Sequence, residues 1–169
     1  KELIPNSIYS THEEKIEEIV GELLRNKNAT ISTAESCTGG YISHLITSIS
    51  GSSDYYLGSV ISYANEIKIK ELNINEKDLI EYGAVSQQIV EQMATGIKNK
   101  MNTDYAIATS GIAGPLGGTE GKPVGTVWIA IATPNSIISK KYNLGKNRER
   151  NIIKAASKAL NMLREELVV

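Results

Sequence analysis

With 169 residues, 41 % of them hydrophobic and 22 % charged, the chain has the length and composition of one soluble globular domain that buries its own core. The formal net charge is −1 and no dense Lys/Arg run occurs, which argues against a nucleic-acid-binding protein. The single cysteine, Cys37, excludes an internal disulfide and a cysteine-based zinc site, and no apolar run approaches the roughly 18 residues that a membrane span needs.

A first helix is predicted near the start of the chain. Residues 11–14, Thr-His-Glu-Glu, have the form of a capping box. Apolar residues then recur at the spacing of one helical face, so we expect a helix over residues 13–27. From there to residue 82 the patterns alternate, with a strand at 29–34, a helix at 38–49, a strand at 55–63, and two short helices at 65–72 and 76–82.

The second half of the chain continues this alternation. Ser86 is a suitable N-cap for a helix that runs to about residue 101. The remaining elements are a strand at 105–109, two strands at 127–133 and 137–142 joined by a Pro134-Asn135 turn, and a helix at 148–167. Six apolar residues of the last helix are expected to face inward: Ile152, Ile153, Ala156, Leu160, Leu163 and Leu167. Strands that alternate with helices, together with one hairpin, predict a mixed sheet covered by helices on both faces.

Two segments between predicted elements stand out chemically. Residues 33–40 read Thr-Ala-Glu-Ser-Cys-Thr-Gly-Gly and join a strand to a helix, whose N-terminus offers unpaired N–H groups to an anion. An ordinary helix cap explains the same residues equally well. Residues 110–126 form a long loop with six glycines, which suits a loop that closes over a ligand. The alternative is a disordered surface loop.

Three shorter stretches carry residues whose ordinary explanation is structural: residues 51–53, residues 62–68, and residues 147–150 at the start of the last helix. An arginine at a helix N-terminus is mildly unfavourable because of the helix dipole. Arg148 therefore has room for a ligand-facing role, such as a bidentate contact with phosphate.

Several stretches of the chain match the motifs of one known protein family. They are residues 33–40, residues 51–53, Tyr63 with residues 65–68, residues 83–86, residues 111–115 and residues 122–127. In their order and spacing they resemble the CinA C-terminal domain family, also called nicotinamide-nucleotide amidase, over nearly the whole chain from about residue 12. Two positions depart from the family pattern. Lys146-Asn147-Arg148 stands where the family usually has Gly-Asp-Arg, and Ala64 replaces a frequent serine.

The resemblance implies a three-layer α/β/α sandwich with a mixed β-sheet. It also implies an amidase that converts nicotinamide mononucleotide to nicotinic acid mononucleotide and ammonia without a metal or an organic cofactor. We expect residues 1–11 to be an N-terminal extension or the remnant of an interdomain linker, and residues 12–169 to be one amidase domain. The expected partners are the nucleotide substrate, further copies of the chain in a homodimer or larger assembly, and an N-terminal CinA domain. Neither a nucleic acid nor a membrane is expected as a partner. Because the chain begins with Lys1 and has no signal peptide, we expect a piece of a longer or processed cytoplasmic protein.

For the chemistry, the resemblance implies a Ser–Lys pair, in which Ser53 is the nucleophile, Lys68 is the base and Tyr63 orients the base or relays a proton. A lysine, with a reference pKa of about 10.4, must be desolvated or placed near another cation to act as a base near neutral pH. The expected substrate-binding residues are Ser36, Thr38, Gly39 and Gly40 for the oxyanion or phosphate, Ser110, Gly111, Gly114, Thr119 and Lys122 from the glycine-rich loop, and Arg148 for phosphate or developing charge.

Two other functions fit the same residues. A non-catalytic module would bind a nucleotide in this pocket and regulate an attached domain. A cysteine amidase would use Cys37, because a thiol pKa can fall at a helix N-terminus.

Overall fold

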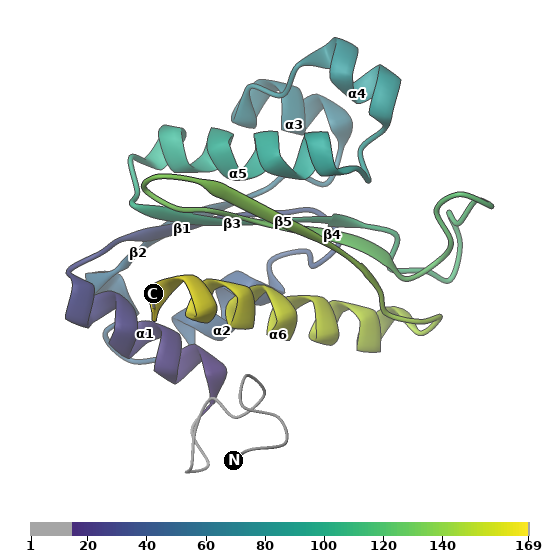
Figure 1. Ribbon diagram of the computed structural model, residues 1–169. Helices are drawn as coiled ribbons and strands as arrows, with labels where there is room; N and C mark the ends of the chain where they lie inside the picture. The colour runs from purple at the N-terminus through teal and green to yellow at the C-terminus, as the bar shows by residue number, and fades with distance from the viewer. Residues whose placement is uncertain (1–14, 169) are drawn as a thin grey trace.

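The computed structural model describes residues 15–168, which form three layers (Figure 1). The helices are α1 (Ile16–Lys27), α2 (Tyr41–Thr47), α3 (Asn65–Leu72), α4 (Glu76–Tyr82), α5 (Gln87–Met101) and α6 (Arg148–Leu167), with a short 3-10 helix, η2 (Ser52–Asp54). The strands are β1 (Ile31–Glu35), β2 (Tyr56–Ile61), β3 (Tyr105–Gly111), β4 (Thr126–Ala132) and β5 (Ile137–Asn143).

The five strands form one mixed sheet in the order β2-β1-β3-β4-β5. β1 is parallel to both β2 and β3, whereas β4 and β5 form the predicted antiparallel hairpin. The α5 helix, with α3 and α4 beyond it, covers one face of the sheet, and α1, α2 and α6 cover the other (Figure 1). The predicted three-layer sandwich with a mixed sheet is confirmed. The carboxyl ends of β1, β2 and β3 therefore meet at one edge of the sheet.

Pairing between β1 and β2 is irregular near the start of both strands. Ile31 lies opposite Tyr56, but Ser32 lies opposite Gly58, so that Leu57 has no partner in β1. The extra residue is a local bulge in an edge strand, and it sets the register of the rest of β2.

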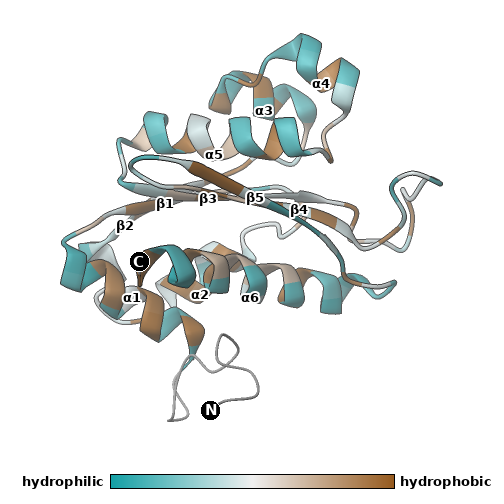
Figure 2. Ribbon diagram, in the orientation of Figure 1, coloured by the Kyte–Doolittle hydropathy of each residue, from teal (hydrophilic) through white to brown (hydrophobic). Residues whose placement is uncertain are grey.

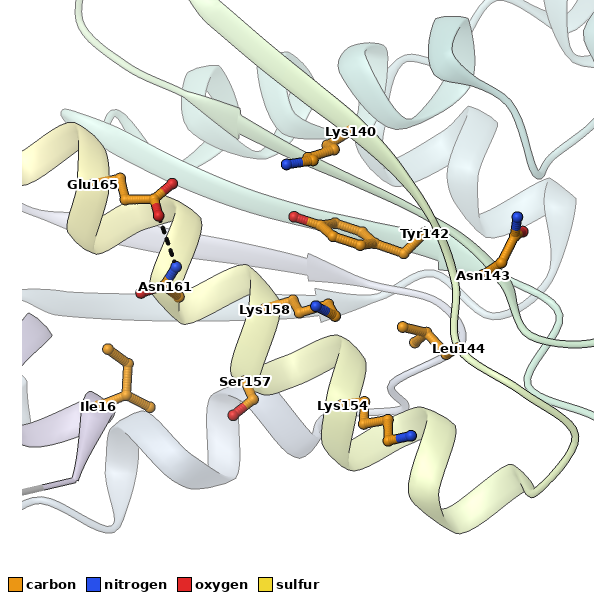
Figure 3. Close-up of a pocket in the computed structure, with 10 residues that line it drawn as sticks. All are labelled: Ile16, Lys140, Tyr142, Asn143, Leu144, Lys154, Ser157, Lys158, Asn161 and Glu165. Atoms are coloured by element: carbon orange, nitrogen blue, oxygen red, sulfur yellow. Dashed lines mark hydrogen bonds between the residues drawn. The ribbon is translucent and has the colours of Figure 1, made fainter. Parts of the chain in front are cut away.

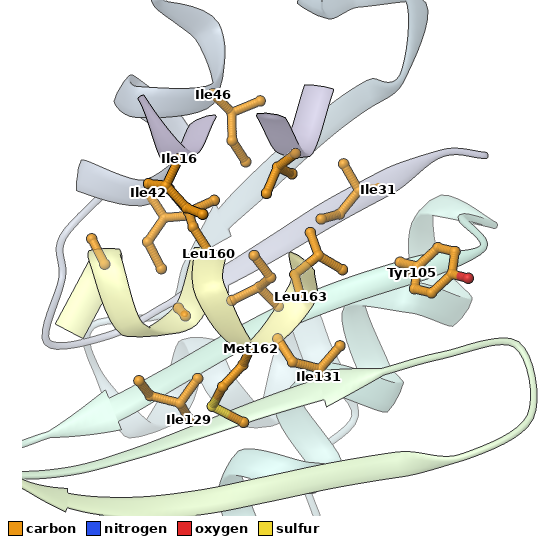
Figure 4. Close-up of a cluster of buried hydrophobic side chains, with 14 of the residues drawn as sticks. Ile16, Ile31, Ile42, Ile46, Tyr105, Ile129, Ile131, Leu160, Met162 and Leu163 are labelled. Carbon is orange, nitrogen blue, oxygen red and sulfur yellow. The ribbon is translucent and has the colours of Figure 1, made fainter. Parts of the chain in front are cut away.

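Two hydrophobic clusters fill the space between the layers. One lies between the sheet and α1, α2 and α6, and includes Ile129, Ile131, Leu160 and Leu163 (Figure 4). The other lies between the sheet and α5. Apolar and hydrophilic residues alternate along the covering helices, as expected for amphipathic helices that bury one face (Figure 2). No helix within residues 15–168 is long and apolar enough to span a bilayer.

The sequence patterns located the six α-helices and the five strands of the described chain, with small errors at the ends, but not the short helix η2. The helices predicted at 65–72, 76–82 and 148–167 have the predicted bounds. The capping box predicted at residues 11–14 lies outside the described residues. Within them, α1 begins at Ile16. One predicted inward-facing residue of α6 was wrong: Ile153 is 45 % exposed, because the buried stripe passes instead through neighbouring positions such as Ala155 and Ala159.

The α3 helix rests directly on α5, and the contact depends on a glycine. A Cβ atom at Gly96 of α5 would overlap the backbone carbonyl of Leu72 at the end of α3. This close approach fixes the position of α3, which carries Lys68.

Candidate active site

A cavity of about 300 Å³ lies where the carboxyl ends of β1, β2 and β3 meet. The cavity is lined by Ser36 and Cys37 after β1, by Tyr63, Asn65 and Lys68 after β2, and by Ala84 and Val85 before α5. Residues 110–114, Leu116 and Gly117, at and beyond the end of β3, and Arg148 at the start of α6 complete the lining. Parallel sheets place their ligand sites at this edge, because loops from neighbouring strands converge there.

The central feature of the cavity is a buried contact between a lysine and a serine. Nζ of Lys68 lies 3.1 Å from Oγ of Ser36, and Lys68 is 1 % exposed. Burial lowers the pKa of Lys68 from 10.5 to about 8, because the charged form loses its hydration. A substantial fraction of the lysine is therefore neutral close to physiological pH and available as a base.

Two backbone carbonyls orient this lysine. Nζ of Lys68 donates to the carbonyl of Ser62 at 2.5 Å and to that of Tyr63 at 3.4 Å. A neutral amine has two N–H bonds and one lone pair. When both N–H bonds point at the two carbonyls, the lone pair is left to face Oγ of Ser36 and can accept its proton.

Ser53 does not take part in this contact. It lies in η2, before β2 begins, whereas Lys68 follows the end of β2. A strand of six residues spans about 20 Å, so Ser53 and Lys68 lie at opposite ends of β2. The Ser53–Lys68 pair expected from the sequence is not formed. Because β1 and β2 are parallel, the serine that follows β1 is the one that meets the lysine, and that serine is Ser36.

The N-terminus of α2, which the sequence indicated as an anion site, is occupied by the chain's own carboxylate. Oε2 of Glu35 accepts hydrogen bonds from the backbone N–H groups of Gly40 and Ile42 at 3.0 and 3.1 Å. Oε1 accepts from the backbone N–H and the hydroxyl of Ser43 at 2.8 and 2.6 Å. Gly39 does not line the cavity either. The prediction that Gly39 and Gly40 contact the substrate is therefore not supported by their positions.

The residues between Ser36 and these glycines take different roles. The hydroxyl of Thr38 is buried against that of Thr109 at 2.8 Å. Among the described residues, the backbone N–H groups of Cys37 and Thr38 donate to no other residue's carbonyl. These two N–H groups directly follow Ser36, as the donors of an oxyanion hole commonly do.

Cys37 lines the cavity, but its thiol is unreactive. Burial raises the pKa of Cys37 to about 12. The thiol therefore stays protonated at neutral pH, and only the thiolate is a good nucleophile. This observation argues against the cysteine amidase that the sequence left open.

Arg148 bridges two walls of the cavity. Its Nη1 atom donates to the carbonyl of Gly114 at 2.9 Å, and its Nη2 atom donates to the hydroxyl of Tyr63 at 2.9 Å. The preceding Asn147 caps α6, because its side-chain oxygen accepts from the backbone N–H of Arg150 at 2.9 Å. The departure from the family pattern at Lys146-Asn147 thus still leaves a capped helix that presents Arg148 to the cavity.

The glycine-rich loop is tightly turned and anchored, and it projects beyond the sheet (Figure 1). Ser110 and Lys122 fasten it to the segment before α5: Oγ of Ser110 donates to the carbonyl of Ala84, and Nζ of Lys122 donates to that of Tyr82, both at 2.7 Å. Thr119 pairs with Lys122 through backbone hydrogen bonds. Ser110, Gly111 and Gly114 line the cavity as expected, whereas Thr119 and Lys122 do not line it and hold the loop instead.

Sequence reasoning missed two buried polar residues that support the site. Glu35 lies within the motif at residues 33–40, but the sequence alone suggests no role for it. Asn151, in α6, is buried and donates to the carbonyls of Ala113 and Gly145 at 3.0 and 2.9 Å. The signal for Asn151 was a polar residue on the apolar side of an amphipathic helix.

The cavity favours an anionic ligand. Lys68 and Arg148 both line it, and no Asp or Glu within the described part of the chain does. Within residues 15–168, no group of three or more His, Cys, Asp or Glu side chains is placed to hold a metal ion.

A larger hollow of about 720 Å³ lies elsewhere, between β5 and α6 (Figure 3). Lysines from both elements flank the ring of Tyr142, with Nζ of Lys158 and Lys140 at 4.7 and 5.6 Å from its centroid. No serine–lysine contact like that of Ser36 and Lys68 is found there, so the smaller cavity is the candidate active site.

Comparisons with known proteins agree with this fold. The solved CinA superfamily protein KP700603 from Klebsiella pneumoniae 700603 is similar to the chain with a TM-score of 0.87 and 32 % identity, over 92 % of this chain and 99 % of that one. The competence/damage inducible protein CihA from Agrobacterium tumefaciens gives a TM-score of 0.86 and 34 % identity, over 95 % of this chain and 99 % of that one.

Relatives by sequence are longer proteins. A CinA-like protein of Trichormus variabilis is 46 % identical over 99 % of this chain and 41 % of its own length. A CinA-like protein of Flavobacterium psychrophilum is 48 % identical over 92 % of this chain and 37 % of its own length. The chain thus spans about two fifths of these relatives. The family model of the CinA C-terminal domain matches residues 13–167, and the chain belongs to the CinA C-terminal domain family.

Proposed function

We propose that the chain hydrolyses the carboxamide of nicotinamide mononucleotide to nicotinic acid mononucleotide and ammonia, with Ser36 as nucleophile and Lys68 as base. The observation that carries this proposal is the 3.1 Å contact between Nζ of Lys68 and Oγ of Ser36, with a lysine pKa of about 8. The substrate is the one that the family resemblance implies, and the cationic cavity is compatible with it.

The first half of the reaction forms an ester. Neutral Lys68 removes the proton from Oγ of Ser36 as Oγ attacks the carboxamide carbon. The negative charge that develops on the carbonyl oxygen is stabilised by the backbone N–H groups of Cys37 and Thr38. The ammonium of Lys68 then returns the proton to the amide nitrogen, the C–N bond breaks, and ammonia leaves.

The second half releases the acid. Lys68, neutral again, removes a proton from a water molecule, which attacks the carbonyl carbon of the ester. The tetrahedral intermediate collapses, the bond to Oγ of Ser36 breaks, and Oγ takes back a proton from Lys68. The carboxylic acid and the starting protein result. The acid then gives its proton to the released ammonia, so that atoms and charge balance as carboxylate and ammonium.

Substrate binding is assigned to the opposite wall. Arg148 uses one N–H of each terminal nitrogen on protein oxygens, which leaves guanidinium donors for a phosphate. Tyr63, 60 % exposed, lies at the mouth of the cavity and is held by the same arginine. In this arrangement the phosphate binds near Arg148 and the carboxamide reaches Ser36.

The test measures ammonia and nicotinic acid mononucleotide from the purified chain, with Ser36→Ala and Ser53→Ala as a matched pair. We expect the wild type and Ser53→Ala to release ammonia at similar rates and Ser36→Ala to release none. Nucleotide binding without ammonia release by the folded wild type would instead favour the regulatory binding module. Loss of activity in Ser53→Ala alone would reject the assignment of Ser36.

A further inference from the structure

Glu35 is a buried charged residue that the proposed reaction does not use. It is the last residue of β1, it is fully buried, and it directly precedes Ser36. A carboxylate removed from water is costly unless it is fully hydrogen bonded. Its place beside the nucleophile therefore calls for an explanation in terms of its contacts.

Four donors surround this carboxylate, and all belong to the start of α2. They are the backbone N–H groups of Gly40, Ile42 and Ser43 and the hydroxyl of Ser43, at 2.6 to 3.1 Å. No lysine or arginine of the described residues forms an ion pair with Glu35. The charge is balanced by hydrogen bonds and by the positive end of the helix dipole.

A hydroxyl network holds the carboxylate in one orientation. The hydroxyl of Tyr56 donates to Oγ of Ser43 at 2.9 Å, and it also lies 2.7 Å from the hydroxyl of Thr33. Oγ of Ser43 in turn donates to Glu35. β1, β2 and α2 are thus connected through partly buried polar side chains that lead to Glu35.

The hydroxyl contact of Thr38 with Thr109 and a few backbone hydrogen bonds also hold the turn that carries Ser36. Gly39 and Gly40 have φ angles of 59° and 97°, which favour glycine. The backbone N–H of Ser36 donates to the carbonyl of Thr109, and the carbonyl of Ser36 accepts from the N–H of Gly39. Glu35 supplies the connection between the end of β1 and the start of α2 on either side of these residues.

We propose that Glu35 is a positioning residue, whose carboxylate holds the strand-to-helix turn so that Oγ of Ser36 meets Lys68 and the N–H groups of Cys37 and Thr38 face the reacting carbonyl. Glu35 touches no substrate in this role. The inference rests on the proposed function of Ser36 as the nucleophile. It also explains why this helix N-terminus is not available to the substrate phosphate.

The experiment uses a probe of serine reactivity that does not depend on the substrate. The second-order rate of labelling by a fluorophosphonate is followed by intact mass, and the modified residue is located by peptide mass spectrometry. Glu35→Gln keeps the size of the side chain but turns an NH₂ group toward N–H donors. We expect Ser36 labelling and kcat to fall at least tenfold, with KM within about twofold, since the nucleophile and the oxyanion donors are displaced while Arg148 is not.

The matched control is Ile46→Val, a fully buried position of the same helix that forms no hydrogen bond with Glu35. It should lower Tm while leaving Ser36 labelling and kcat near those of the wild type. If Glu35→Gln does not fold, Ser43→Ala removes one of the four donors and retains three. A smaller drop in labelling, with the fold intact by circular dichroism, is then expected.

The outcomes separate the two proposals. Equal labelling of Ser36 in the wild type and in a folded Glu35 or Ser43 variant overturns the role of Glu35 and leaves the amidase proposal standing. If labelling is reduced in the variants and the wild type releases no ammonia, the proposed role of Glu35 stands and the proposed substrate is rejected. An unlabelled wild type rejects Ser36 as a nucleophile, and the role of Glu35 falls with it.

Discussion

Nζ of Lys68 lies 3.1 Å from Oγ of Ser36, although the two residues are 32 positions apart in sequence. They meet because β1 and β2 are parallel neighbours, so that the segments after both strands reach the same edge of the sheet. The contact is buried and free of carboxylates. Burial lowers the pKa of Lys68, and no carboxylate in the contact counteracts this effect.

The pH dependence of activity follows from this pKa. If neutral Lys68 is the base, kcat/KM for ammonia release increases about tenfold per pH unit below the pKa and levels off above about pH 8. Lys68→Arg keeps a positive charge that cannot be lost near neutral pH and should be inactive at every pH tested. A flat profile between about pH 6 and 9 would show that another group supplies the base.

Stability should also depend on pH through Lys68. Its pKa is about 8 when folded and 10.5 as the ordinary value, so between these pH values the unfolded chain binds more protons than the folded one. The free energy of unfolding therefore rises with pH in this window, by at most about 1.4 kcal/mol per unit. Urea denaturation at about pH 7.5 and 9.5 should reveal the increase, and Lys68→Met should abolish it.

Cys37→Ala tests whether the thiol of Cys37 takes part in the reaction. Because the pKa of Cys37 is raised to about 12, the thiol is protonated during turnover, and its removal should leave kcat within about threefold of the wild type. Iodoacetamide at pH 8 should likewise leave the folded wild type active. Complete loss of ammonia release in a folded Cys37→Ala variant would revive the cysteine amidase.

Arg148→Gln tests the assignment of the phosphate. A charged hydrogen bond contributes about 1.5–3 kcal/mol, so kcat/KM for the mononucleotide should fall roughly 10- to 100-fold. The corresponding nucleoside, nicotinamide riboside, has no phosphate and should be hydrolysed equally slowly by both proteins. A similar fall for both compounds would mean that Arg148 acts on the reacting amide or only through Tyr63 and Gly114.

Gly96→Ala tests the seating of α3. The new Cβ atom would overlap the carbonyl of Leu72 and push α3 away from α5. Overpacking of this kind costs about 1–3 kcal/mol, more than the gain of about 1 kcal/mol in helix propensity. Because α3 carries Lys68, kcat should fall together with Tm. Gly21→Ala is a matched control, since its Cβ atom would overlap the buried side chain of Tyr55, which does not line the cavity, and should lower Tm while kcat is retained.

The elements of the fold were predictable because their signals are local. Ser86 caps α5 and accepts a hydrogen bond from the N–H of Ile89, as its residue type suggested. The hairpin of β4 and β5 follows from two apolar runs around a short turn. Errors concentrate at ends such as that of α2, which is shorter than predicted because Glu35 and two glycines shape the residues before it.

The candidate site was harder to predict because it depends on strand order. Ser36 and Ser53 both lie in short polar stretches, and nothing near either residue shows which one meets Lys68. Only the parallel pairing of β1 with β2 places the end of one strand beside the end of the other. The role of Glu35 was hard to predict for a related reason. The sequence suggests that the N-terminus of α2 is free to bind an anion, whereas the carboxylate of Glu35 occupies it.

The unpaired Leu57 lies at the start of β2, and regular pairing with β1 continues from Gly58 toward the site. Beyond this residue each position of β2 is displaced by one relative to a regular ladder, and the strand ends just before Ser62 and Tyr63, whose carbonyls receive the N–H groups of Lys68. Deleting Leu57 would leave Tyr56 opposite Ile31 and Gly58 opposite Ser32 in a regular ladder, so that the same two carbonyls would still reach the lysine. The bulge thus accommodates an extra residue in the edge strand at a distance from the groups that orient the base.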